Sequence, residues 1–456
     1  MKLPGEQSYT SHRRIFVKKI WGSYQAKRWR VFAFLYGIFF LFPWLSIKGR
    51  PAVFFDIPHR KFYLFGAIFW PQDVYLLALL LITLAYTLFF VTALFGRVWC
   101  GYACPQTVGS SLFIEIERLI EGDRPQQMRL DKAPWTNEKL LKRVAKHAAF
   151  ILVSALFSFN LLSYFLTMPE LLHRVASFSL NVTNVLWFLF FFALAYSDFG
   201  RFREQLCHGP CPYGRFQGVM FDADTLFVNF DVKRGEPRQF FRKGQERQAG
   251  DCVDCKLCTD VCPAGIDIRN GPQYECISCL SCVDACDGVM KKVGFETGLI
   301  RVGSEHSFAG EPKKPRPRLY LYAGLLTVLI GFMGFQVIHH ASTQVDVIRN
   351  RSFLYQKLPD GRVANVFMVK ALNMDAIAHT YKIRYEGLDA KLLGGDPTIQ
   401  AKSGQVAEDD IALALRPEPG SFQRIIPFQM VLVDAKTGRV LAKHPSTFVL
   451  PDASQP

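Results

Sequence analysis

The sequence lacks most of the signatures by which soluble enzymes are recognised. It has no glycine-rich phosphate loop, no CxxCH haem-attachment motif and no Ser, His and Asp pattern of a hydrolase. Cysteine is missing after residue 286, and Asp, Glu, Lys and Arg are missing from five long apolar runs. These absences exclude a P-loop NTPase and a c-type cytochrome. They also exclude a disulfide framework spread along the chain, which is the usual pattern of small secreted domains.

The composition of the chain fits a mixture of membrane spans and polar domains. Half of the 456 residues are hydrophobic, and 41 of them are Phe, which is unusual for a soluble protein. The formal net charge is +15, yet no nucleic-acid recognition motif accompanies it. We therefore expect no nucleic-acid partner. The excess of basic residues is assigned instead to the cytoplasmic flanks of membrane helices.

The five apolar runs predict membrane-spanning helices at residues 31–47, 74–95, 149–168, 180–196 and 319–338. Lys and Arg alternate between the flanks: eight in residues 1–30, four in 48–73, nine in 97–148 and one in 169–179. By the positive-inside rule the N-terminus and the loops 97–148 and 197–318 are cytoplasmic. Five spans then place the C-terminal part in the periplasm of a bacterial inner membrane.

These segments give a predicted domain organisation and fold class. The fold class is a polytopic α-helical membrane protein of about five spans, with a two-cluster ferredoxin domain in a cytoplasmic loop and a C-terminal immunoglobulin-like β-sandwich. The sandwich is expected because residues 381–386 alternate and residues 428–433 and 440–441 flank a hairpin turn. The expected parts are a basic N-terminus (1–30), a four-helix membrane domain (31–200), a cytoplasmic loop (201–318) with the ferredoxin domain at about 245–295, a fifth helix (319–338) and the β-domain (340–456).

Two cysteine runs in the cytoplasmic loop carry the strongest chemical signal. Each has the spacing CxxCxxCxxxC, the bacterial ferredoxin pattern, in which the fourth cysteine of one run binds the cluster of the other. We therefore expect two 4Fe–4S clusters; zinc is disfavoured because its sites typically pair two CxxC motifs. The expected ligands are Cys252, Cys255, Cys258 and Cys286 for one cluster, and Cys262, Cys276, Cys279 and Cys282 for the other.

Two further cysteine pairs follow the second and fourth apolar runs and share the form CxxxCP. Both pairs should lie at the cytoplasmic face, and the repetition indicates an internal duplication that argues against mere packing. Proline favours the first helical turn, so the second cysteine of each pair should cap a helix, whose dipole would lower the thiol pKa. Four such thiols suit copper, a third iron–sulfur cluster or a dithiol–disulfide couple, and spacing alone leaves these three open. The candidate catalytic and copper residues are Cys100, Cys104, Cys207 and Cys211.

Taken together, the segments GRVWCGYACPQT and CHGPCPYG, the tandem cluster runs, the five spans and the β-domain resemble the CcoG (FixG/RdxA) family of cytochrome c oxidase accessory proteins. The resemblance covers nearly the whole chain. It implies reduction of Cu(II) to Cu(I) for assembly of a high-affinity C-type haem–copper oxidase. It also implies a copper ATPase, copper chaperones and the nascent oxidase as partners.

The expected function is that of a cupric reductase carrying two 4Fe–4S clusters. One alternative is a membrane ferredoxin conduit that passes electrons between a quinol pool and a redox partner. Another is an assembly scaffold whose clusters sense redox state. The sequence does not identify the cytoplasmic electron donor and leaves a homo-oligomer open.

Overall fold

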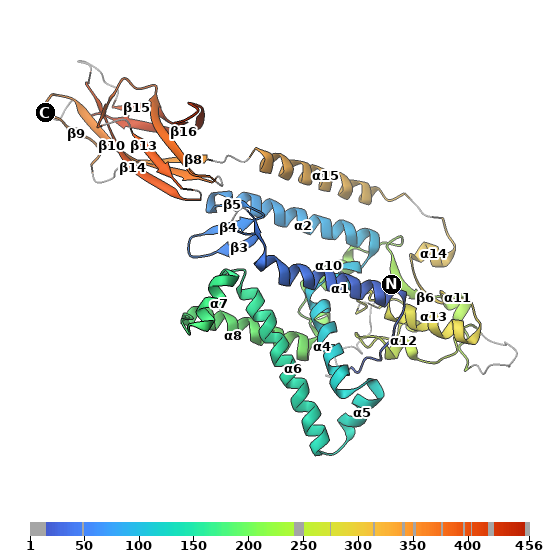
Figure 1. Cartoon of the computed structure of the whole chain (residues 1–456). Helices are drawn as coiled ribbons and strands as arrows, with labels where there is room; N and C mark the ends of the chain where they lie inside the picture. Colours follow the sequence, from blue (N-terminus) through green and yellow to red (C-terminus); the bar gives the residue numbers. More distant parts are fainter. Residues whose placement is uncertain are drawn as a thin grey trace. The chain divides into compact units, whose positions relative to one another are not determined.

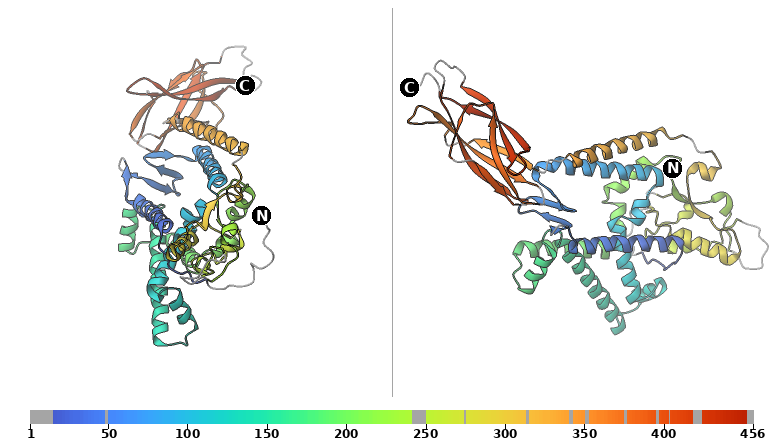
Figure 2. Two further views of the ribbon diagram at one scale, coloured as in Figure 1. Left: turned by 90° about the vertical axis from the view of Figure 1, so that its right-hand side faces the viewer. Right: turned by 45° about the horizontal axis from the view of Figure 1, so that its top comes forward.

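The computed structural model describes residues 15–47, 50–240, 250–273, 275–312, 315–339, 343–349, 353–374, 377–394, 397–402, 404–417 and 424–451. Residues 1–14 of the predicted basic N-terminus lie outside this range. The chain divides into two units (Figures 1 and 2): Met1–Trp44 with Leu76–Met333, and Leu45–Tyr75 with Gly334–Pro456. The first unit holds all twelve cysteines.

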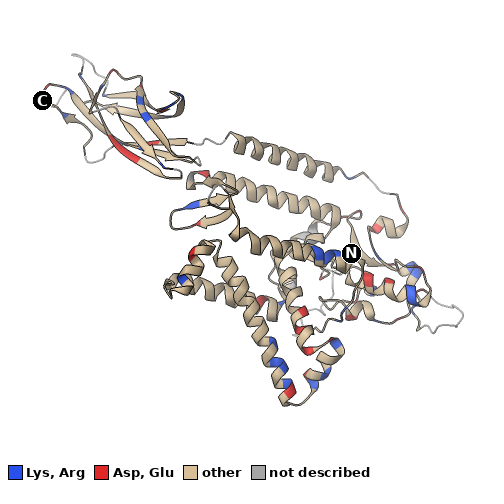
Figure 3. Ribbon diagram, viewed as in Figure 1, with Lys and Arg blue, Asp and Glu red and all other residues tan. Residues whose placement is uncertain are grey.

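Four helices of the described residues are long and apolar enough to cross a membrane. Neither α8 nor α15 has a residue buried within the protein, so their apolar side chains require lipid. Helix α2 contains no charged residue, and the only one in α15 is Arg318 in its first turn. Charged residues gather instead on α5 and on the first turns of α6 (Figure 3). The four are α2 (Val74–Phe95), α6 (Asn137–Leu162), α8 (Val182–Ser197) with its π-helical extension Asp198–Phe202, and α15 (Pro317–Ile338).

The first predicted span corresponds to α1 (Ser23–Leu41), which begins and ends earlier than predicted. Its first turns contain Lys27, Arg28 and Arg30, so it is not among the four most apolar helices. Pro43, in the 3₁₀ turn Phe42–Trp44, ends the helix because proline cannot donate the next backbone hydrogen bond. The third predicted span is also shifted, since α6 begins at Asn137 rather than at residue 149 and ends at Leu162.

The remaining helices of the first unit are shorter than α6. They are α3 (Val98–Tyr102), α4 (Pro105–Glu121), α5 (Arg124–Lys132), α7 (Met168–Ala176), α9 (Gln205–His208), α10 (Pro212–Met220), α11 (Val232–Gly235), α12 (Leu257–Asp260), α13 (Ser281–Val293) and α14 (Glu305–Ala309). Of these, α3, α9, α12 and α13 contain cysteines. Strand β6 (Phe227–Phe230) pairs antiparallel with β7 (Ile300–Gly303). Together with α13, this ribbon buries Phe230, Met290 and Leu299 next to the cluster cysteines.

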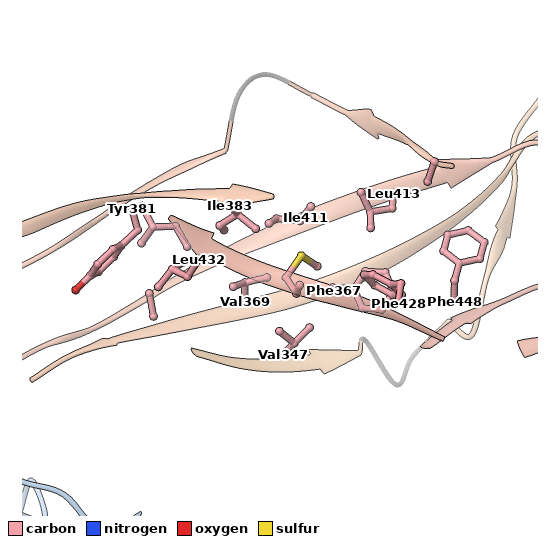
Figure 4. Packing of buried hydrophobic residues seen from close by; sticks show 14 of the residues in the cluster. Val347, Phe367, Val369, Tyr381, Ile383, Ile411, Leu413, Phe428, Leu432 and Phe448 are labelled. Carbon is pink, nitrogen blue, oxygen red and sulfur yellow. The ribbon is translucent and has the colours of Figure 1, made fainter. Parts of the chain in front are cut away.

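The second unit is an antiparallel β-sandwich, as predicted. One sheet has the order β12-β14-β10-β8, with β9 also paired to β10, and the other has the order β13-β11-β15-β16. Figure 4 shows Phe367, Phe428 and Phe448 packed between the sheets with aliphatic side chains. The predicted hairpin is formed by β15 and β16. The strands are β8 (Thr343–Arg349), β9 (Gln356–Lys357), β10 (Val363–Asn373), β11 (His379–Glu386), β12 (Lys391–Leu393), β13 (Thr398–Ala401), β14 (Val406–Leu415), β15 (Ile425–Asp434) and β16 (Val440–Val449).

The segment between α1 and α2, which the sequence left as a plain loop, is also folded. Strands β3 (Val53–Asp56), β4 (Lys61–Leu64) and β5 (Ala67–Phe69) form a small antiparallel sheet, and β1 (Ser46–Ile47) pairs with β2 (Arg50–Pro51). Ile68 and Trp70 pack against Leu372 and Met374 of the sandwich. The Lys61 ammonium donates to the carbonyl of Gly404 at 2.7 Å. This sheet therefore belongs to the same unit as the sandwich.

Candidate functional site: four thiols beside two cluster loops

Each CxxxCP segment consists of a short helix, a tight turn and the start of a second helix. The second cysteine of the segment lies at the beginning of that second helix. Cys104 is the N-cap of α4 and Cys211 the N-cap of α10, each with extended backbone and followed by proline at the first helical position. The first cysteine of each pair lies in a short helix, Cys100 in α3 and Cys207 in α9. The capping geometry predicted from the prolines is thus confirmed in both copies.

Hydrogen bonds cross between the two turns and hold them together. Arg97, just before the first pair, donates to the carbonyl of Gly214, just after the second, at 2.9 Å. Conversely, the Gln106 amide, just after the first pair, donates to the carbonyl of Arg203, just before the second, at 2.9 Å. The structure therefore brings the two sequence repeats into one site.

The four thiols lie near enough to influence one another's protonation. Burial, together with negative charge on Cys104, Cys100 and Cys211, raises the pKa of Cys207 to about 12. Burial also raises the pKa of Cys104, although the backbone N–H groups of Thr107 and Gln106 act in the opposite direction. The expectation of a lowered pKa at Cys104 was therefore wrong, because desolvation outweighs the effect of the helix N-terminus.

A buried charge network fixes the helices that carry the two turns. Glu117 of α4 contacts the Lys146 ammonium of α6 at 3.4 Å and the Arg203 guanidinium at 2.7 Å. Glu121 contacts Lys146 at 2.8 Å and Arg143 at 3.0 Å. Helix α4 is therefore packed within the protein, with Glu117 and Glu121 paired with cations.

Glu204 is a buried carboxylate that the sequence analysis missed. It is 6% exposed, and its Oε1 has no hydrogen-bond partner among the described residues. Burial raises its pKa, while the charges of Arg203 and Arg28 partly counter that shift. Its charge in turn raises the pKa of Cys207. No sequence motif marks this position, since a single Glu beside a loop is common.

The two ferredoxin runs adopt the same backbone path. Asp254 and Ser278, two residues after the first cysteine of each run, both have left-handed φ, of 49° and 54°. Lys256 and Leu280, four residues after it, also have left-handed φ, of 57° and 62°. Non-glycine residues rarely adopt this conformation, and its repetition at matched positions marks a shared functional geometry.

The crossed assignment of cluster ligands agrees with the neighbours of each thiol. The pKa of Cys286 is raised to about 12 by burial and by the charges of Cys258, Cys252 and Cys255, which belong to the other run. The pKa of Cys262, the fourth cysteine of the first run, is likewise raised to about 12 by burial and by the charges of Cys279 and Cys276. Each fourth cysteine therefore lies near cysteines of the other run, as the ferredoxin pattern requires.

The donor set fits two iron–sulfur clusters. All twelve cysteines are free of disulfides, and the backbone N–H of Ser278 donates to the Cys276 sulfur at 3.4 Å, a contact of the kind that tunes cluster potential. Within the described ranges no three His, Cys, Asp or Glu side chains close around a single metal ion. Two complete CxxCxxCxxxC runs of free thiols are the donor set of 4Fe–4S clusters rather than of zinc. Bound clusters would supply one-electron transfer.

The first CxxxCP turn lies directly against the second cluster loop. A Cβ atom on Gly101 would come within 2.6 Å of the Ser278 carbonyl oxygen and 2.8 Å of that of Ile277. Gln25 of α1 donates from its amide to the Cys279 carbonyl at 3.1 Å, and Arg28 donates to the Gly101 carbonyl at 2.9 Å. Sequence reasoning missed these residues because the contact joins segments far apart in the chain.

Comparison with known proteins finds relatives over most of the chain. Three family models match: a 4Fe-4S binding domain at residues 77–117, a 4Fe-4S dicluster domain at 202–305, and the IG-like fold at the C-terminal of FixG at 333–451. The nitrogen fixation protein FixG of Rhizobium meliloti is 34% identical over 94% of this chain and 88% of its own length. Protein RdxA of Cereibacter sphaeroides is 37% identical over 88% of this chain and 87% of its own length.

A crystal structure of a FixG-related protein from Vibrio parahaemolyticus aligns with 24% of this chain and 95% of that chain. The identity is 24% and the TM-score is 0.20, so we conclude nothing from this likeness.

The apolar helices and the two iron–sulfur domains define a membrane iron–sulfur electron-transfer protein. The extended similarity to FixG and RdxA, together with the FixG-type C-terminal fold, is more specific. The chain belongs to the FixG/RdxA family.

Proposed function

We propose that this protein is a cupric reductase, which receives Cu(II) at the four CxxxCP thiols and converts it to Cu(I). Each turnover consumes one electron: a reduced cluster is oxidised by one electron as one Cu(II) becomes Cu(I). A low-potential one-electron donor must then restore the cluster. The Cu(I) is proposed to serve assembly of a high-affinity C-type haem–copper oxidase, together with a copper ATPase and copper chaperones, as the family resemblance implies.

The observation that carries this proposal is the position of four thiols next to a cluster loop. Thiolates favour Cu(I) over Cu(II), so binding at Cys100, Cys104, Cys207 and Cys211 would add driving force to the reduction. The four thiols lie close enough together that negative charge on Cys104, Cys100 and Cys211 raises the pKa of Cys207. Cys100 and Cys207 are only partly buried, so an ion could reach them.

The proposed placement in the membrane follows from charge. The N-terminus and the cysteine-bearing loops 97–148 and 197–318 are assigned to the cytoplasm, and the β-domain from residue 340 to the periplasm. The proposed domain limits remain those of the sequence: 1–30, 31–200, 201–318, 319–338 and 340–456. This topology gives the thiols and clusters access to cytoplasmic copper and a cytoplasmic donor.

A stopped-flow experiment tests the proposal. The full chain in detergent is reduced with dithionite, freed of excess reductant, and mixed anaerobically with Cu(II). Oxidation of the reduced clusters should coincide with the appearance of Cu(I), which a Cu(I)-specific chelator detects. The double variant Cys100→Ser/Cys104→Ser should abolish this reaction but keep its clusters, and ferricyanide should still oxidise it. A variant that reduces copper as fast as the parent would rule the proposal out.

A second candidate function is favoured by one observation. The 4Fe-4S binding domain model covers residues 77–117, which include Cys100 and Cys104. If the four thiols hold a third cluster, the membrane helices would form a conduit to or from a quinol pool. Iron analysis separates the candidates, since two clusters contain about eight iron atoms per chain and three contain about twelve. Twelve irons, with oxidation by quinone and not by copper, would establish the conduit.

A further inference from the structure

We propose that the cluster held by Cys262, Cys276, Cys279 and Cys282 is the one that delivers electrons to the four thiols, and that Gly101 is required for the delivery because it lets the two backbones touch. This order of electron transfer, from that cluster to the four thiols, deepens the proposed function and rests on it. It makes the cluster of Cys252, Cys255, Cys258 and Cys286 the one that first receives electrons from the donor.

The contact at Gly101 is made by backbone on both sides. Gly101 lies between Cys100 and Cys104, and its α-carbon faces the carbonyls of Ile277 and Ser278, which lie between two cluster ligands. A Cβ here would be 2.6 Å and 2.8 Å from those oxygens, closer than real Cβ contacts come. No flexible side chain can yield, so only glycine permits this approach.

Hydrogen bonds on either side of Gly101 hold the contact in place. Arg97 is 6% exposed and joins three segments, since it donates to the Cys276 carbonyl at 3.4 Å and to the Gly214 carbonyl at 2.9 Å. On the other side, Arg28 binds the Gly101 carbonyl, and Gln25, one turn before it in α1, binds the Cys279 carbonyl. Both cysteines reached by these bonds are ligands of the same predicted cluster.

The position of the other cluster fits the receiving role. One of its ligands, Cys255, is exposed, with Cys252 and Cys258 buried, whereas no ligand of the delivering cluster is exposed among these described cysteines. Electron tunnelling slows exponentially with distance. A donor that docks from solution is therefore served best by the cluster with the exposed ligand, and the thiols by the cluster whose loop touches them. The transfer to copper moves one electron and no proton or bond, so no further reactant is needed.

The experiment uses Gly101→Ala, with Gly288→Ala as the matched control. Gly288 lies in α13 of the same iron–sulfur domain, and a Cβ there would meet nothing within 4 Å. Dithionite-reduced full-length protein is mixed with Cu(II) or, separately, with ferricyanide. We expect Gly101→Ala to slow oxidation by Cu(II) about tenfold or more, as for an ångström-scale misplacement of reacting groups, and to leave oxidation by ferricyanide unchanged. Gly288→Ala should change neither rate.

A second readout does not depend on copper. Hydrogen–deuterium exchange of peptides containing Ile277 and Ser278 should become faster in Gly101→Ala and stay unchanged in Gly288→Ala, while iron content and cluster EPR signals remain those of the parent. If Gly101→Ala loses its clusters, Arg97→Lys takes its place. Lysine keeps the charge but cannot span both carbonyls, so it should slow the copper reaction selectively.

The outcomes separate the two proposals. A copper rate that depends on Cys100 and Cys104 but is unchanged by Gly101→Ala overturns the order of clusters and leaves the reductase intact. Equal slowing with copper and ferricyanide also overturns it, because the defect would then lie in the cluster itself. A copper rate that survives in Cys100→Ser/Cys104→Ser overturns both proposals. Slower oxidation by copper alone, together with faster hydrogen–deuterium exchange at Ile277 and Ser278, supports the proposed order of electron transfer.

Discussion

The two units of this protein are stabilised in different ways. The interior of the β-sandwich is mainly apolar: Phe367, Met430 and Leu432 are completely buried in it, and the buried Asn365 and Asn373 are hydrogen-bonded to backbone carbonyls. The interior of the cysteine-bearing unit also contains charged side chains, among them Arg28, Arg97, Glu117, Glu121, Lys146 and Glu204. The free energy of apolar burial does not depend on orientation, whereas that of hydrogen bonds and ion pairs does. The difference teaches that the sandwich is stabilised mainly by apolar packing, while the cysteine unit must place particular charged atoms at particular points.

The largest expected effect tests whether the cysteine unit depends on its metal ligands. Cys279→Ser replaces a thiolate ligand by a hydroxyl, which binds iron poorly, and should remove the cluster assigned to that run. Iron should fall by about half, from about eight to about four atoms per chain. The sandwich should unfold at the same temperature as in the parent. A variant that keeps its full iron content would contradict the ligand assignment.

The next effect tests the apolar side of the comparison. Phe367→Ala should destabilise the sandwich by about 3–5 kcal/mol, because Phe367 is completely buried among aromatic and aliphatic neighbours. Chemical denaturation followed by far-UV circular dichroism measures the change in the free energy of unfolding. The absorbance of the clusters should be unaffected. The control Phe353→Ala removes an exposed ring and should change little. Loss of clusters in Phe367→Ala would show that the two units are not independent.

A somewhat smaller effect is expected in the charge network. Lys146→Met removes the cation shared by Glu117 and Glu121, and leaves each with one arginine partner. We expect a loss of about 2–4 kcal/mol in the first unit, since Glu117 and Glu121 would each lose a buried charged partner and be left less fully paired. Lys142→Met, which removes the exposed partner of Glu138, is the control and should change almost nothing. Equal stability of the Lys146→Met and Lys142→Met variants would mean that the buried ion pairs contribute nothing to the stability of the first unit.

The smallest effect concerns Glu204, whose pKa is raised by burial. A carboxyl with a raised folded pKa costs no stability below its unfolded pKa of about 4.3, and destabilises the fold increasingly as pH rises above that value. Glu204→Gln removes the charge, so the variant should match the parent at pH 4 and melt at a higher temperature at pH 7. Thermal unfolding across this range measures the difference. A variant that is less stable at pH 7 would show that the carboxylate has a stabilising partner.

The sequence predicted those features that depend on local pattern. The cluster spacing, the proline-capped helices after Cys104 and Cys211, and the hairpin around residues 434–439 all require only neighbouring residues, and the structure contains each of them. The bounds of α1 and α6 were misplaced, because polar first turns continue a helix without an apolar signal. The folded segment 45–75 was missed for a different reason. Its strands are short and gain stability by packing on Leu372 and Met374, far along the chain.

At the site itself, prediction failed where geometry decides. The pKa of Cys104 depends on burial that no local pattern reveals. Gly101 carries no motif of its own, and its role emerges only when Ile277 and Ser278 lie against it. Tertiary contacts of this kind need the folded chain, because they join residues that are more than a hundred positions apart.

The matched turns of the two ferredoxin runs have a consequence for how the protein is made. Asp254, Lys256, Ser278 and Leu280 share no side-chain chemistry, yet all four hold the left-handed conformation. Their side chains are not the common cause, and what the four positions share is their spacing from the cysteines of each run. Before iron arrives, little compels a nascent chain to keep that unfavourable shape. Biogenesis should therefore couple maturation of this segment to cofactor insertion, and cells starved of iron should accumulate chains that proteases cut first at these turns.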